Sequence, residues 1–122
     1  MESQAYEVGD RRLTLIESRL KKDILGQLGI SESVYDALLE EFVGQAREKI
    51  SELRTAFLLK DSENARKILH SLKGAAENLR IKKMAGVIDE IRGLAEGGGS
   101  ENEIEERLNT LEGHASNIED AF

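Results

Sequence analysis

His70 lies on the polar side of a segment whose apolar residues follow a helical spacing. These apolar residues are Ala65, Ile68, Leu69, Leu72, Ala75, Ala76 and Leu79. At about 100° per residue, the stripe centres near Leu72 and Leu79, and His70 projects roughly 160° away from it. An imidazole ordinarily titrates near pH 6.5, so an exposed ring offers a nucleophilic nitrogen at neutral pH. Such a ring can attack an acyl phosphate and hold the phosphoryl group through a labile P–N bond.

The helical neighbours of His70 suit a phosphoryl carrier. Lys73, at i+3, can bring its ammonium to the phosphoryl oxygens, and Arg66 and Lys67 in the preceding turn can add positive charge. Gly74, at i+4, removes a side chain that would shadow the imidazole. Glycine inside a helix costs roughly 1 kcal/mol relative to alanine. Gly74 therefore indicates either close approach of a partner or tight packing of a neighbouring helix.

The charge distribution points to the same region. The chain carries a net charge of −7, which argues against general nucleic-acid binding. Residues 66–83 nevertheless contain six basic side chains and one acidic side chain, Glu77, so this stretch carries +5 and the remainder −12. Such a stretch can attract an anionic partner or phosphate, although charge runs are also typical of solvated helix faces. We expect Arg66, Lys67 and Glu77 to contribute to a docking surface around His70.

Other chemistries find little support in the sequence. His114 lacks a following Lys-Gly pair, and two distant histidines without patterned carboxylates do not predict a metal site. The glycines at 97–99 lack the lysine and hydroxyl of a nucleotide-binding loop. We therefore expect no cofactor, no metal, no nucleotide site and no enzymatic activity of the chain's own.

Composition gives a first expectation for location. The sequence contains no cysteine and no proline. No stretch approaches the roughly 20 apolar residues of a membrane span, and residues 1–4 lack the features of a secretory signal. These features are compatible with a cytoplasmic protein without membrane contact.

The spacing of apolar residues predicts an all-α fold in a single domain, residues 1–122. The expected helices span residues 11–28, 34–59, 63–79, 82–96 and about 101–120, with residues 1–9 frayed. Ser31 or Ser33, Asp61 or Ser62, and a Ser100–Glu103 capping box are the expected helix starts. Short connections predict that residues 34–120 form an antiparallel up-down four-helix bundle. The helix at 11–28 is expected to cap one end of it, and a monomer is expected.

Residues 69–79, Leu-His-Ser-Leu-Lys-Gly-Ala-Ala-Glu-Asn-Leu, resemble the signature of histidine-containing phosphotransfer (HPt) domains. That signature has a His-x-Leu-Lys-Gly core followed by small residues and a leucine. Residues 38–42, 59–61 and 88–91 resemble the family's surrounding segments; the resemblance covers residues 34–96 well and 101–120 only in pattern. It implies that His70 is the phosphoacceptor, Lys73 stabilises the phosphate and Gly74 gives steric clearance. One departure is Arg80, where the family often has a glycine that closes the helix in a left-handed conformation.

The resemblance implies a phosphorelay module. HPt domains accept a phosphoryl group from a receiver-domain aspartate and pass it reversibly to another receiver, and Mg²⁺ is expected on the receiver. The expected partners are response-regulator receiver domains, a sensor histidine kinase, or both. The docking surface around His70 is expected to reach the preceding helix, where Phe42, Val43 and Ala46 are candidates for apolar contacts, with core burial the stronger expectation for Phe42.

Two other interpretations stay open. The chain can be the phosphoacceptor domain cut from a hybrid or chemotaxis-type histidine kinase. It can also be a non-catalytic helical interaction module in which His70 is incidental.

Overall fold

The computed structural model describes residues 21–120, which are helical throughout with short connections and contain no strand. The chain divides into two compact units, one up to Tyr35 and the other from Asp36 onward. The predicted frayed segment 1–9 and most of the predicted helix at 11–28 lie outside the described residues. In the first unit, residues 21–28 are helical and end at Gly29, whose φ is +66°.

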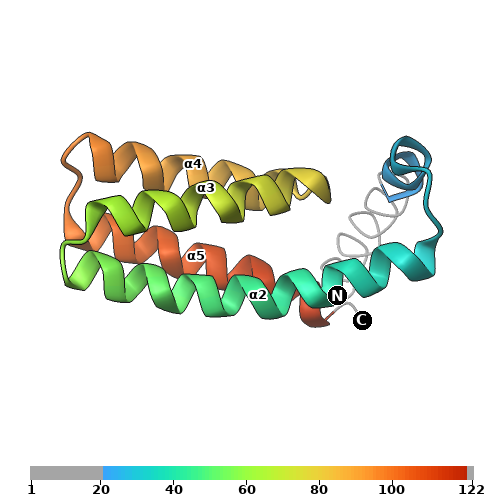
Figure 1. Cartoon of the computed structure of the whole chain (residues 1–122), viewed down its shortest axis with the longest axis horizontal. Coiled ribbons are helices and arrows are strands. Elements are labelled where there is room, and N and C mark those ends of the chain that lie inside the picture. The colour runs from blue at the N-terminus through green and yellow to red at the C-terminus, as the bar shows by residue number, and fades with distance from the viewer. Residues whose placement is uncertain (1–20, 121–122) are drawn as a thin grey trace, which may run out of the picture. The chain divides into compact units, whose positions relative to one another are not determined.

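Four helices follow one another along the chain: α2 (Glu32–Leu58), α3 (Ser62–Asn78), α4 (Lys82–Glu96) and α5 (Glu101–Asp120). All four begin and end within two residues of the predicted bounds. Within the second unit they lie side by side (Figure 1), with α3 packed on α4 and α4 on α5. The predicted all-helical fold is confirmed, and the short connections bring all four helices onto one core.

Capping side chains explain where three of the helices begin. Asp61 Oδ1 accepts a hydrogen bond from the Asn64 N–H at 3.2 Å, which satisfies one unpaired amide of α3. Ser100 and Glu103 form the reciprocal capping box, with hydrogen bonds of 3.0 and 3.1 Å between each side chain and the other residue's amide. The bond from the Ser100 amide holds the pKa of Glu103 below its usual value. Ser31 Oγ accepts from the Val34 amide at 3.3 Å and begins α2.

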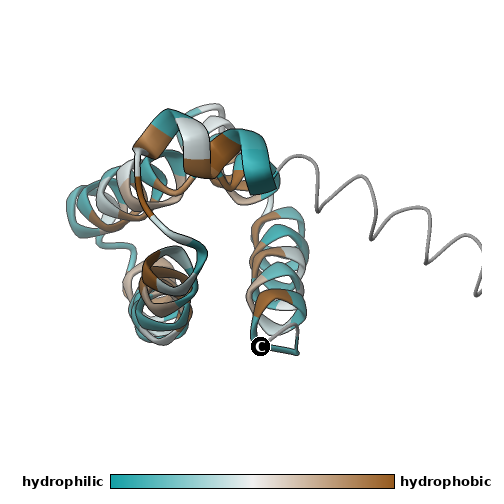
Figure 2. Ribbon diagram, turned by 90° about the vertical axis from the view of Figure 1, so that its right-hand side faces the viewer, coloured by the Kyte–Doolittle hydropathy of each residue, from teal (hydrophilic) through white to brown (hydrophobic). Residues whose placement is uncertain are grey.

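Each helix of the bundle is amphipathic, and Figure 2 shows hydrophobic and hydrophilic residues interspersed along each ribbon. The core draws on all four helices; its largest fully buried side chains are Ile50, Leu53, Leu69, Leu72, Met84, Ile88, Ile91, Leu108 and Leu111. No polar or charged residue is buried among residues 21–120. The hydrophobic effect over this core is therefore the main stabilising term of the fold.

Two expectations about α2 are corrected. Val43 and Ala46 are buried like Phe42, with at most 3% exposure, so none of the three offers an apolar docking contact. They point into the core because they share the helical face of Ile50 and Leu53. Leu38 is separated by four residues from Phe42, at the helical spacing of the apolar residues that predicts the helix at 34–59, and burial is therefore expected; it is 40% exposed. The physical reason is length: α2 has 27 residues and α3 has 17, so the first turns of α2 extend beyond α3 (Figure 1).

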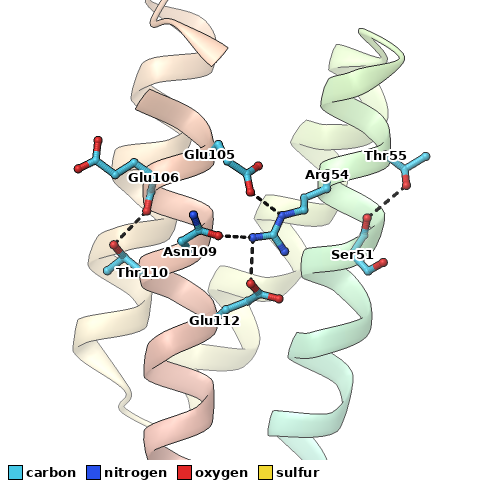
Figure 3. A network of polar contacts seen from close by, with 8 residues as sticks. All are labelled: Ser51, Arg54, Thr55, Glu105, Glu106, Asn109, Thr110 and Glu112. Carbon is cyan, nitrogen blue, oxygen red and sulfur yellow. Dashed lines mark hydrogen bonds and ion pairs between the residues drawn. The ribbon is translucent and has the colours of Figure 1, made fainter. Parts of the chain in front are cut away.

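Arginine side chains join α2 to α5. Arg54 of α2 bonds three α5 side chains at 2.7–3.0 Å (Figure 3): Glu105, Asn109 and Glu112. Seven residues earlier, Arg47 bonds two side chains later in α5, both at 3.1 Å: Ser116 and Glu119. As residue numbers rise along α2, those of its partners fall along α5, so these two helices run antiparallel.

Candidate functional site

His70 is exposed in the middle of α3, between the buried side chains of Leu69 and Leu72. The two leucines fix the rotation of the helix about its axis, and that rotation directs the imidazole toward solvent. Within residues 21–120, no hydrogen bond or ion pair joins the His70 ring to another residue. The predicted exposure of His70 is confirmed, and its ring nitrogens are accessible to a reagent or partner.

Two hollows of the surface include residues near His70 in the sequence of α3. A hollow of about 910 Å³ includes Arg66 and Leu69, and a smaller one of about 430 Å³ includes Glu77 and Asp89. His70 lines neither of these two hollows. The His70 ring is therefore exposed on α3 outside both hollows.

Lys73 contacts a carboxylate on the following helix. Its Nζ lies 2.8 Å from Oδ1 of Asp89 on α4, and its side chain is 24% exposed. The ammonium is therefore engaged across the α3–α4 interface, although Lys73 is a helical neighbour of His70. The sequence predicts no role for Asp89. It lies in residues 88–91, a segment that resembles the family's following helix, and that resemblance gave no partner for Lys73.

The three residues expected in the docking surface are all exposed: Arg66, Lys67 and Glu77. Lys67 lies 3.7 Å from Glu63 in an exposed i,i+4 pair, which is worth only a few tenths of a kcal/mol. Glu63 and Asp89 both lie outside residues 66–83, and their carboxylates face Lys67 and Lys73 within that stretch. The local positive charge is therefore smaller than the count over those residues suggests.

Gly74 is exposed on α3, and a Cβ added there meets nothing within 4 Å. Tight packing of a neighbouring helix, one of the two explanations for this glycine, is therefore excluded in the second unit. Clearance for a partner beside His70, the other explanation, stays a prediction.

Arg80 adopts the left-handed conformation, with φ of +61°, that the family often gives to glycine at this position. The Arg80 and Ile81 amides donate to the Glu77 and Ala76 carbonyls at 3.0 and 2.9 Å, which closes α3. The Arg80 guanidinium also donates to the Glu77 carbonyl at 3.0 Å. Helix α3 thus ends with a left-handed residue although that residue is not glycine, and the Arg80 side chain bonds to the terminal carbonyls.

The second histidine and the other sequence features were also located in the part of the chain that is described. His114 is half-buried on α5, a helix that packs on α4. No group of three or more metal-ligating side chains gathers in residues 21–120. None of the described helices combines the length and the apolar character needed to cross a bilayer.

Comparison with known proteins agrees with this geometry. A family model described as "Hpt domain" matches residues 37–121, which is more than half of the chain. No curated protein and no solved structure gives a significant match. Hpt domains perform histidine phosphotransfer in two-component signalling, as phosphocarrier modules that interact with receiver domains and kinases in phosphorelays. The chain belongs to the Hpt domain family.

Proposed function

We propose that the chain is a phosphorelay carrier that accepts a phosphoryl group on His70 from the aspartyl phosphate of a receiver domain and passes it to another receiver. The observation that carries this proposal is the His70 ring, exposed and without a partner on the polar face of α3. A receiver with an acidic cleft and a bound Mg²⁺ complements such a face. The chain itself contributes no cofactor and takes part stoichiometrically.

The transfer step follows from the chemistry of imidazole. A ring nitrogen of His70 donates its lone pair to phosphorus while the bond from phosphorus to the aspartate oxygen breaks. The aspartate leaves as a carboxylate with the bonding electrons. The ring is transiently cationic and releases one proton to solvent, which leaves a neutral ring that carries the negatively charged phosphoryl group. Return of the phosphoryl group to a second receiver reverses these changes.

The surrounding residues have distinct roles in this proposal. Lys73 stabilises the negative charge of the phosphoryl oxygens as a point charge. Gly74 leaves room for the receiver, and Arg66, Lys67 and Glu77 contact its surface. The docking surface relies on the polar face of α3, because the α2 residues Val43 and Ala46 are buried.

The bundle holds His70 in place. We infer the antiparallel up-down order from connections of three to four residues between successive helices, which leave little chain for any other path. Monomeric state and a cytoplasmic location belong to the same proposal. Either a free-standing carrier or the phosphoacceptor domain of a larger kinase fits this chemistry.

The proposal is tested by incubating the chain with a receiver domain phosphorylated on its aspartate. We expect an acid-labile, base-stable phosphoprotein, and His70→Gln should not be labelled. His114→Gln is the matched control and should be labelled like the wild type. Label that persists in His70→Gln refutes the assignment of His70. Binding to an acidic partner without any phosphotransfer favours a non-catalytic interaction module instead.

A further inference from the structure

The ammonium of Lys73 has a partner that the transfer chemistry does not use. Lys73 Nζ and Asp89 Oδ1 are 2.8 Å apart, and the two side chains are 24% and 48% exposed. The contact joins the helix that carries His70 to the helix that follows it. Both charged groups reach solvent, so neither is left as an unpaired buried charge when the ion pair opens. Opening the pair therefore costs little free energy.

A phosphoryl group on His70 competes for the same ammonium. Lys73 is one turn from His70 along α3, within the spacing at which helical side chains meet. A phosphorylated side chain carries about −1.5 to −2 charges, more than one carboxylate. The ammonium is one point charge on a flexible stem, so moving it toward the phosphoryl oxygens weakens its contact with Asp89.

We propose that Asp89 is a positioning residue that holds Lys73 away from His70 in the unphosphorylated chain and so opposes phosphorylation. This inference rests on the proposed function. The free energy of the Lys73–Asp89 contact is lost, wholly or in part, each time Lys73 moves to the phosphoryl group. Asp89 therefore shifts the transfer equilibrium toward the phosphorylated receiver and makes the chain a readier donor. No covalent bond to Lys73 or Asp89 forms or breaks.

The neighbouring residue Glu90 provides a matched control. Its Oε2 lies 2.8 Å from Arg107 Nε on α5, and its side chain is 53% exposed. Glu90→Gln removes the same charge from the same helix, and it breaks an ion pair of equal length. It leaves Lys73 engaged, because Arg107 and not Lys73 is the partner of Glu90.

The experiment measures the equilibrium constant for phosphoryl transfer between the chain and one receiver domain. We expect Asp89→Asn to favour the phosphorylated chain about two- to fivefold, the range of a half-exposed ion pair. Asp89→Glu retains the carboxylate, so its equilibrium constant should lie closer to the wild-type value than that of Asp89→Asn. The constant of Glu90→Gln should lie within about 1.5-fold of the wild-type value. Circular dichroism and thermal unfolding check that each variant is folded.

A double-mutant cycle separates positioning from the direct effect of the Asp89 charge. In the Lys73→Ala background, Asp89→Asn should no longer change the constant. An Asp89→Asn constant equal to the wild-type value overturns the inference and leaves the proposed function intact. An equal shift with and without Lys73 also overturns it, because the aspartate then acts without the lysine. A wild-type chain that accepts no phosphoryl group refutes the proposed function itself.

Discussion

Replacement of Gly74 by alanine should stabilise the fold and impair transfer. Gly74 is helical, and an added Cβ meets nothing within 4 Å. Alanine loses less backbone freedom on folding than glycine does, so the gain in the free energy of unfolding is about 0.5–1 kcal/mol. In a domain of this size that gain raises the melting temperature by about 2–8 °C. Stability and activity are expected to move in opposite directions because the open space serves a partner.

The expected loss of activity has a physical basis. If the receiver closes tightly over Gly74, the added methyl group costs about 1–3 kcal/mol, a typical penalty for overpacking. That corresponds to a decrease of about 5- to 150-fold in the transfer rate at low receiver concentration. Stopped-flow or rapid-quench transfer from a phosphorylated receiver measures this rate, and calorimetry measures the melting temperature.

Gly113→Ala is the matched control. Gly113 also lies within a helix, α5, and a Cβ there also meets nothing within 4 Å. It should stabilise the fold by a similar amount without slowing transfer. A Gly74→Ala variant that transfers at the wild-type rate refutes the clearance role, and one that is destabilised refutes the open space seen beside Gly74.

Two further predictions concern stability. The left-handed conformation costs an ordinary residue about 1–2 kcal/mol, a cost that glycine avoids. Arg80→Gly should change the free energy of unfolding by less than this amount, because the variant also loses the guanidinium bonds to the end of α3. A decrease of more than about 1 kcal/mol in the free energy of unfolding, measured with urea, shows that those bonds dominate. The hydrogen bond from Arg54 holds the pKa of Glu112 below its usual value. The unfolded chain therefore binds a proton at Glu112 more readily than the folded chain does. The stability that Glu112 contributes is fully present above about pH 5 and is lost as the pH falls through the lowered pKa. Glu112→Gln should lower the free energy of unfolding by up to about 1 kcal/mol at pH 7, and this free energy should fall less steeply in acid than it does for the wild type. An equally steep fall in the variant contradicts this assignment.

Much of the fold follows from short-range sequence patterns. The helix bounds were predictable because apolar spacing and capping residues such as Asp61 and Ser100 act within a few residues. The exposure of His70 was predictable for the same reason, since the buried stripe on α3 fixes the direction of the opposite face.

The features that the sequence did not reveal depend on how helices meet. The contact between Lys73 and Asp89 requires the register of α3 against α4, which no single helix specifies. The burial of Val43 and Ala46 depends on which neighbours cover α2. The left-handed Arg80 is a local feature, but its side chain gives no signal of that conformation, because the compensating bonds to backbone carbonyls form only in the folded helix end.

The most direct test of the central claim is the location of the phosphoryl group after transfer from a receiver. Peptide mapping by mass spectrometry under alkaline conditions preserves a P–N bond and assigns it to a residue. We expect one phosphoryl group per chain, in the peptide that contains residues 66–73 and on the imidazole of His70. A phosphoryl group found on any other residue contradicts the account, whatever the rate of its transfer.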